Sequence, residues 1–373
     1  MLMAESLAVF CVLCFLTAFS LSLVLTIGSK RIAVRTGLLA HPKDNRFHKK
    51  IVPMGGGIAI FFTMFLLCLA AAGFIKLLVY DGTTSLFGRD FELYIEGFAG
   101  RINELLIILG CAALLFALGL WDDFKNLKPM PKLAIEFAVA FAAAYFAEVR
   151  VEFFIENKLY ASVLSSVWVV LIINVFNFLD NMDGASAGIA TIVSLIIFII
   201  ATLSQQAFVA GFAMTLAGTL TGFLIFNFYP ASIFMGDAGS LVIGFFIGIL
   251  TLKTTYYQEA EDIRWYIVLM PLVILAIPLY DFISVTAIRL HQGKSPFAGD
   301  TQHFSHRLKK RGLNEVQAVL MLYLATITTG LGAVVLKVSE WPYGLLVFIQ
   351  TVMVLAIIAV LESTGNNEKK HPN

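Results

Sequence analysis

Long apolar runs alternate with short polar segments along nearly the whole chain. Each run is roughly 20 residues or more, which is long enough for a helix to cross a bilayer core of about 30 Å. We place eleven such runs, at 6–27, 54–79, 103–121, 132–149, 159–178, 186–204, 207–228, 239–257, 265–288, 315–336 and 341–361. The pattern predicts an all-α, polytopic integral membrane bundle of about eleven transmembrane helices.

The rest of the pattern fixes the domain organisation. No polar stretch between the runs is long enough for a soluble domain, so residues 1–362 are predicted to form a single integral membrane domain. Residues 363–373 form a polar tail that we expect to be disordered.

Composition agrees with a membrane protein. The 373-residue chain is 59% hydrophobic and 14% charged, whereas soluble domains are about a quarter charged. Its mean hydropathy is +0.86. The net charge of +1 gives no argument for a nucleic-acid partner, and we expect none.

Basic residues are distributed unevenly between the two sets of loops. The loops after odd-numbered runs, together with the C-terminal tail, hold 18 of the 26 Lys and Arg residues. The opposite loops are acidic, with Asp81, Asp90, Glu92 and Glu96 in one of them. Because Lys and Arg accumulate on the cytoplasmic side, we predict an outside N-terminus and a cytoplasmic C-terminus.

The four cysteines all fall within predicted helices. Cys11 and Cys14 form a C-x-x-C, a spacing also found in redox and metal sites. They lie in an apolar run with no second pair and no neighbouring histidine, so packing is the favoured interpretation.

Polar residues of several chemical types gather in the predicted cytoplasmic loops, at 41–57, 121–132, 174–184, 226–240 and 289–308. Five of them are aspartates next to an apolar run: Asp122, Asp123, Asp180, Asp183 and Asp237. Each alone is explained well by an interfacial cap or ion pair, but five on one face favour a shared site. Carboxylate and amide oxygens are the ligands that Mg²⁺ prefers, often together with substrate phosphates.

Two turns in these loops are candidate anion sites. Pro129 and Pro131 open the fourth run with Lys132 beside them, and free amides at a helix start bind phosphate. Gly236 and Gly239 flank Asp237 in a tight turn into the eighth run. The run Gly55–Gly57 is open to two interpretations, a phosphate cradle or close helix packing.

Three histidines complete the set: His48, His303 and His306. The last two lie just before Arg307 and a basic stretch. Phosphate contact or proton transfer is favoured over a zinc site, because the cysteines are far away in sequence.

These segments resemble, in order and topology, the motifs of the polyprenyl-phosphate N-acetylhexosamine-1-phosphate transferase family, glycosyltransferase family 4. The resemblance covers Gly37 to about Leu313. It implies transfer of a sugar-1-phosphate, from UDP-GlcNAc or a related UDP-N-acetylhexosamine, to undecaprenyl or another polyprenyl phosphate, which initiates a cell-surface glycan such as lipopolysaccharide O-antigen. It also implies an enzyme of a bacterial inner or plasma membrane with a cytoplasmic active site, in which Mn²⁺ substitutes for Mg²⁺. A homodimer is an open alternative to a monomer.

The resemblance also assigns roles to individual residues. Asp122 and Asp123 match the paired aspartates, Lys132 the phosphate-contacting lysine, and Asp180 an acid of the N-x-x-N-x-x-D-x-x-D segment. Asp237 matches the chief Mg²⁺ ligand and Asn177 a second one. Asp183 and Phe234 match the uracil contacts. His303, His306 and Arg307 fall in the loop that contacts the pyrophosphate, and His48 is the remaining candidate for phosphate contact.

Three positions depart from the family pattern. Ser305 stands where these enzymes typically have a histidine, Asn181 where they have a glycine, and Ala185 where leucine is common. We expect a histidine at position 305 to be tolerated.

Three other functions compete with this one. A phospho-MurNAc-pentapeptide translocase would share most motifs, although the sequence after His306 does not resemble that group. A secondary transporter would carry charges near the bilayer midplane, where only Glu136 and Asp281 are predicted. A non-catalytic scaffold gives no reason for the five aspartates on one face.

Overall fold

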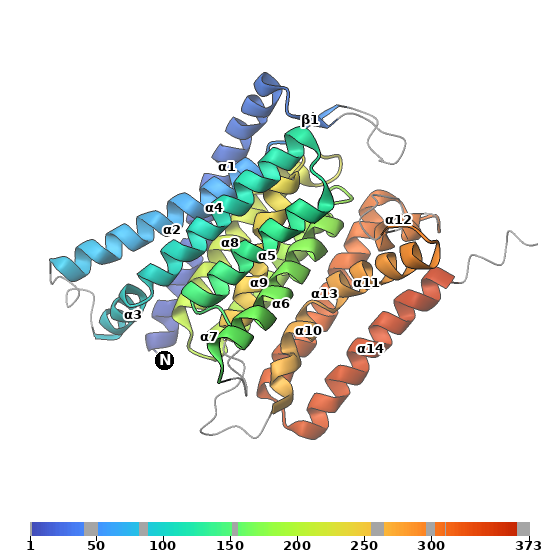
Figure 1. The fold of residues 1–373 in the computed structure, drawn as a ribbon. Helices are drawn as coiled ribbons and strands as arrows, with labels where there is room; N and C mark the ends of the chain where they lie inside the picture. Colours follow the sequence, from blue (N-terminus) through green and yellow to red (C-terminus); the bar gives the residue numbers. More distant parts are fainter. Residues whose placement is uncertain are drawn as a thin grey trace, which may run out of the picture.

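The computed structural model describes residues 2–40, 51–81, 89–150, 156–254, 265–295, 303–309 and 311–363. These residues form a helical bundle with one small antiparallel pair of strands, β1 (Leu39–Ala40) and β2 (Val52–Pro53) (Figure 1). The helices are α1 (Leu2–Thr36), α2 (Gly56–Tyr80), α3 (Arg89–Ala99), α4 (Ile102–Lys125), α5 (Pro129–Phe146), α6 (Lys158–Leu179), α7 (Ala185–Leu203), α8 (Ala207–Asn227), α9 (Asp237–Lys253), η2 (Trp265–Leu269), α10 (Met270–Ile274), α11 (Ala276–His291), α12 (Phe304–Lys309), α13 (Glu315–Val338) and α14 (Trp341–Ser363).

Nine helices of the described residues are long and apolar enough to cross a membrane, or ten if α10 and α11 together form one bent span. Helix α9 has 17 residues and lies at the lower limit of roughly 17–25 for a spanning helix. The polytopic helical architecture is therefore confirmed. The count of eleven and the orientation of the termini stay predictions.

The helix predicted at 265–288 is bent and divided into η2, α10 and α11. The chain bends by 69° between Ile274 and Ala276, where α10 gives way to α11. Pro278, in the first turn of α11, has no N–H to donate to the carbonyl of Ile274, so the helical ladder is interrupted there. The first helix also continues past its apolar run, to Thr36, and α3 was not predicted.

Helix α9 lies at the centre of the bundle. Its residues from Ala238 to Thr251 are all buried, and it packs against α2, α4 and α6. Two glycines permit this approach: a Cβ added at Gly119 would lie 2.5 Å from the Asp237 carbonyl oxygen, and one at Gly57 would lie 2.3 Å from the Gly239 nitrogen. Small residues at such crossings let helix backbones meet closely in membranes.

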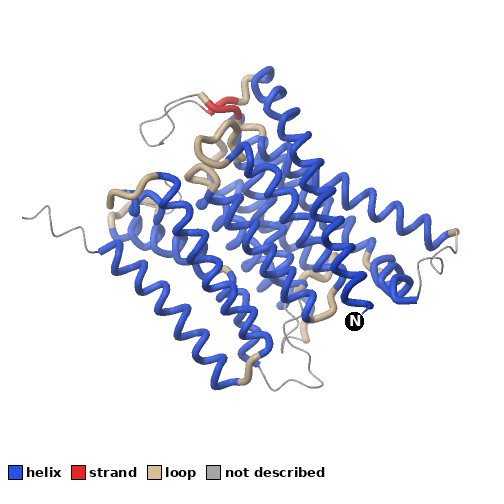
Figure 2. The backbone as a smooth tube through the Cα atoms, turned by 180° about the vertical axis from the view of Figure 1, so that it is seen from behind, coloured by secondary structure: helices blue, strands red, loops and turns tan. Residues whose placement is uncertain are grey.

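The smoothed backbone, seen from behind in Figure 2, shows the loop-rich end of the bundle beside the strand pair. The start of α1 lies at the opposite end from β1, and the end of α14 lies near α12 (Figure 1). The motif-bearing helix ends thus lie at one end of the bundle.

Candidate active site

Lys132 joins two of the predicted aspartates. Its ammonium lies 2.8 Å from Asp122 Oδ2 and also pairs with Asp237 Oδ2. The three residues come from α4, α5 and α9, so this cluster ties three helix ends together. The other Asp122 oxygen accepts the Leu127 amide at 2.5 Å, which fixes the turn between α4 and α5.

Asp123 caps the N-terminus of α9. Its two carboxylate oxygens accept the backbone amides of Asp237 at 2.8 Å and Ala238 at 3.1 Å. A carboxylate at this end of a helix is favoured by the unpaired amides and the helix dipole. The turn at Gly236 was predicted as an anion site. In this structure the anion is the protein's own Asp123, and Gly236 has a φ of +72° that suits glycine.

The Gly55–Gly57 run is a packing element rather than an open phosphate cradle. The amides of Gly56 and Gly57 donate to the carbonyls of Phe234 and Met235, both at 2.9 Å. The Phe234 amide donates to the Pro53 carbonyl at 2.8 Å. The Phe234 backbone is therefore held on the start of α2, and its side chain is half-buried.

The turn after α6 carries the other predicted acids. Asp183 Oδ2 accepts the Ala231 amide at 2.8 Å, which joins this turn to the 228–236 loop that bears Phe234. Asp180 lies within electrostatic range of Asp123. The Asn177 Nδ2 atom is buried and has no hydrogen-bond partner among the described residues. The predicted acids and Phe234 thus lie around one site.

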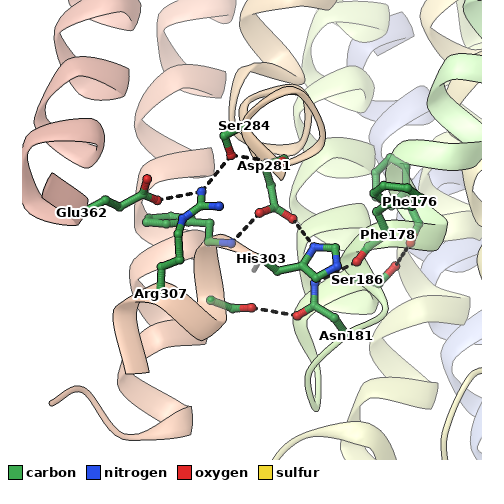
Figure 3. Close-up of polar contacts among 11 residues, drawn as sticks. Phe176, Phe178, Asn181, Ser186, Asp281, Ser284, His303, Arg307 and Glu362 are labelled. Carbon is green, nitrogen blue, oxygen red and sulfur yellow. Dashed lines mark hydrogen bonds and ion pairs between the residues drawn. The ribbon is translucent and has the colours of Figure 1, made fainter. Parts of the chain in front are cut away.

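The loop at α12 is anchored on α11 (Figure 3). His303 Nδ1 lies 3.0 Å from Asp281 Oδ2, and the Phe304 amide donates to Asp281 Oδ1 at 2.6 Å. Both Asp281 and His303 are buried. A carboxylate on one ring nitrogen fixes the orientation of an imidazole.

Arg307 is the second polar anchor of α12. Its Nη2 donates to Ser284 Oγ at 2.7 Å and to Glu362 Oε1 at 3.0 Å (Figure 3). His306 lies in α12, but its side chain is outside the described part of the chain. His48 also lies outside the described residues.

Three acids in these contacts were not predicted as site residues. Asp281 holds His303, Glu362 holds Arg307, and buried Glu136 accepts Asn174 Nδ2 at 2.7 Å. Asp281 and Glu136 carried a signal that was available in the sequence, since an acid inside an apolar run is a functional candidate by default. Glu362 carried none, because it stands at the edge of a polar tail.

An apolar cavity of about 260 Å³ lies between α5, α6 and α11. Its walls include Leu133 and Phe137 of α5, Asn174 and Phe178 of α6, and Phe282 and Thr286 of α11. Leu133, in the wall of the cavity, directly follows Lys132 of the ion-pair cluster along α5.

Metal ligands are sparse in the described part of the chain. No group of three or more His, Cys, Asp or Glu side chains there is placed to hold a metal ion. The cysteines are free thiols; Cys11, Cys68 and Cys111 are buried and Cys14 is partly so, as the packing interpretation expects.

Comparison with known proteins gives the family. Residues 105–255 match the family described as glycosyl transferase family 4. The chain is 30% identical over 371 residues to a probable undecaprenyl-phosphate N-acetylglucosaminyl 1-phosphate transferase of Bacillus subtilis, covering 97% of this chain and 94% of the relative. A decaprenyl-phosphate N-acetylglucosaminephosphotransferase of Mycolicibacterium smegmatis is 28% identical, with 83% and 78% covered.

A third relative is the undecaprenyl-phosphate alpha-N-acetylglucosaminyl 1-phosphate transferase of Escherichia coli, 26% identical over 80% of this chain and 76% of its own length. The first of these alignments extends far beyond the motifs, through almost every helix. With the motif residues gathered at one end of the bundle, the chain belongs to the polyprenyl-phosphate N-acetylhexosamine-1-phosphate transferase family.

Proposed function

We propose that this chain transfers GlcNAc-1-phosphate from UDP-GlcNAc to a polyprenyl phosphate and releases UMP. The observation that carries the proposal is the cluster in which Lys132 lies between Asp122 and Asp237. The cluster places a cation among carboxylates where α4 ends and α5 and α9 begin. The chain also aligns over almost its whole length with a relative named for this transfer.

The reaction is a phosphoryl transfer. An oxygen of the lipid phosphate forms a bond to the β-phosphorus of the UDP-sugar, and the bond from that phosphorus to the α–β bridging oxygen breaks. UMP leaves with the electron pair, and a sugar-diphosphate-lipid remains. Both reactants are anions, so the site must neutralise their repulsion, and Lys132 supplies a positive charge for this.

The residues fit a bound Mg²⁺. Asp237 is the principal candidate ligand because it is the first residue of α9 and its side chain is 33% exposed. Asn177 is the second, because its buried Nδ2 atom has no hydrogen-bond partner among the described residues and the assignment of the amide O and N atoms is interchangeable. Few protein ligands are expected, since Mg²⁺ commonly binds one or two carboxylates plus substrate phosphates. When bound, the ion would neutralise charge on the diphosphate.

The paired aspartates have different tasks in this proposal. Both Asp123 oxygens are engaged by backbone amides, so Asp123 positions the start of α9 and hence Asp237. Asp122 orients Lys132. No dedicated base is required, because a phosphate monoester with a second pKa of about 6 is largely ionised at neutral pH.

The two substrates reach the site from different sides. The apolar cavity between α5, α6 and α11 suits part of the polyprenyl chain, with the phosphate near Lys132. Phe234 and Asp183 lie on connected loops and would contact the uracil. Under the predicted orientation this end of the bundle faces the cytoplasm of a bacterium, where UDP-sugars are present.

The alternatives are less well supported. The relatives named above are all GlcNAc-phosphate transferases, which favours GlcNAc over MurNAc-pentapeptide. Against a transporter, Glu136 and Asp281, the acids predicted to lie inside apolar runs, have structural partners: Asn174 for Glu136 and His303 for Asp281.

The test uses purified protein in detergent with undecaprenyl phosphate and a panel of UDP-sugars. UMP release and mass spectrometry of the lipid should give GlcNAc-diphosphate-lipid. Lys132→Ala is the matched inactive control. Release of UMP with another UDP-sugar alone would correct the substrate, and absence of any UMP or lipid product would overturn the proposed function.

A further inference from the structure

Two of the three positions at which the sequence is expected to depart from the family pattern, Ser305 and Asn181, contact each other. Ser305 Oγ donates to Asn181 Oδ1 at 2.7 Å, across 124 residues of sequence. Ser305 lies in the first turn of α12, and Asn181 lies in the turn between α6 and α7. The contact therefore joins the histidine loop to the turn that carries Asp180 and Asp183.

Both the oxygen and the nitrogen of the Asn181 side-chain amide form hydrogen bonds. Its Nδ2 donates to the Phe178 carbonyl at 2.8 Å, so the side chain bridges the end of α6 and the start of α12. Ser305 is only 2% exposed and Asn181 is half-buried, so the bond is partly shielded from water. Buried hydrogen bonds hold their groups in place because leaving either partner unpaired is costly.

This bridge completes a support around His303. Asp281 of α11 holds the His303 ring and the Phe304 amide on one side. On the other side the Phe178 ring meets His303 edge to face, with ring centres 5.9 Å apart. Asn181 fixes the backbone of Phe178 and the first turn of α12 together.

We propose that Asn181 and Ser305 act as one polar latch that positions His303 against the turn carrying Asp180. The proposal rests on the transfer reaction proposed above. Neither residue is assigned to a substrate or metal, so both are positioning residues. They form a specific replacement for the glycine and histidine expected at these positions, and each depends on the other.

The burial of Ser305 changes the sequence-based expectation that histidine is tolerated there. The histidine side chain has about four more heavy atoms than the serine side chain and would need the space beside Asn181. Overpacking a buried site displaces its neighbours. Glycine at 181 removes the obstructing side chain, so the histidine should be accepted only in that background.

The experiment compares Asn181→Gly, Ser305→His and the double variant. We expect each single variant to lose about tenfold or more in kcat with a small change in the KM for UDP-GlcNAc, and the double variant to recover to within about threefold of the parent. A second double-mutant cycle uses Asn181→Ala, Ser305→Ala and the double variant, which remove the bond without adding bulk. The loss of kcat/KM in the double variant should differ from the product of the two single losses by roughly three- to tenfold.

Two outcomes would overturn the latch. Additive losses in both cycles would mean that the residues act independently. Coupling in the thermal unfolding midpoint without coupling in kcat would make the contact structural only. If the parent protein releases no UMP from any UDP-sugar, the proposed function has failed and the latch, which rests on it, is overturned with it. Additive losses in a parent that does release UMP overturn the latch alone.

Discussion

The carboxylate of Glu362, in the last turn of α14, lies 3.0 Å from Nη2 of Arg307 in α12. The same carboxylate accepts a hydrogen bond from the Tyr280 hydroxyl at 3.0 Å, and the Glu362 backbone carbonyl accepts one from the Arg311 guanidinium. The final helix is thus part of the support of the histidine loop.

Arg307→Lys should lower kcat/KM by about tenfold or more. Arginine presents a planar fork that can hold Ser284, Glu362 and a substrate phosphate together, whereas lysine is a single point of charge. Steady-state kinetics with UDP-GlcNAc measure this. Glu362→Gln is the matched control, because it keeps a hydrogen-bond acceptor for Arg307 and should lose much less activity.

The opposite outcome is equally informative. A fully active Arg307→Lys enzyme would remove Arg307 from the catalytic residues. Arg307 would then belong with Lys309, Lys310 and Arg311 to the basic stretch on which the predicted orientation rests. Equal losses in Arg307→Lys and Glu362→Gln would assign Arg307 to holding α14 rather than the substrate.

Phe234→Ala should raise the KM for the UDP-sugar by roughly 5- to 150-fold, since stacking on a base is worth about 1–3 kcal/mol. The Phe234 backbone forms hydrogen bonds with the backbones of Pro53 and Gly56, so the loop should keep its conformation without the phenyl ring. The KM for polyprenyl phosphate serves as the internal control and should barely move. A rise in the lipid KM instead would place Phe234 in the lipid site.

Asp123→Asn should destabilise the protein by about 1–3 kcal/mol, the typical cost of an unsatisfied buried donor. Both carboxylate oxygens accept amides at the start of α9, and asparagine has only one acceptor for the two. Thermal unfolding in detergent measures the loss. Unchanged stability would mean that Asp123 does not hold α9.

The sequence indicated candidate site residues, but it did not indicate the residues that hold them in place. Asp122, Lys132 and Asp237 were recognisable because polar residues at the ends of apolar runs must converge on one face. Their pairing was not predictable, because it depends on α4, α5 and α9 meeting at one end. The role of Asp123 as a cap for another helix has the same origin.

The helices show where hydropathy ceases to be informative. An apolar run reveals that residues 265–288 are buried or in lipid, but not that the backbone turns by 69° inside the run. Pro278 gave a local hint, although proline near a helix start is also compatible with a straight helix. Likewise Gly55–Gly57 fitted two interpretations until the hydrogen bonds to Phe234 and Met235 favoured packing.

The orientation of the bundle can be tested by cysteine labelling. In a background without the four native cysteines, Glu96→Cys should react with a membrane-impermeant maleimide added outside intact cells. Lys294→Cys should react only after permeabilisation. Both side chains are exposed at present. Labelling of Glu96→Cys only in permeabilised cells would invert the predicted orientation.

Asp237→Asn should lower turnover by about two to three orders of magnitude while the protein stays folded, a size typical for removal of charge stabilisation in an active site. The fold should survive because Lys132 keeps its bond to Asp122, and the Asp237 backbone amide still donates to Asp123. Activity in the parent should require Mg²⁺ or Mn²⁺, disappear with EDTA and return on re-addition.

Asp122→Asn separates the metal from the ion pair. Both substitutions remove one carboxylate from Lys132, but only Asp237 is assigned to the ion. We therefore expect the Mg²⁺ concentration for half-maximal activity to rise in Asp237→Asn and to stay near the parent value in Asp122→Asn. Near-parental activity of Asp237→Asn, or the same Mg²⁺ dependence in both variants, would show that Asp237 is not the principal ligand, and the acids of the turn after α6 would then be the next candidates.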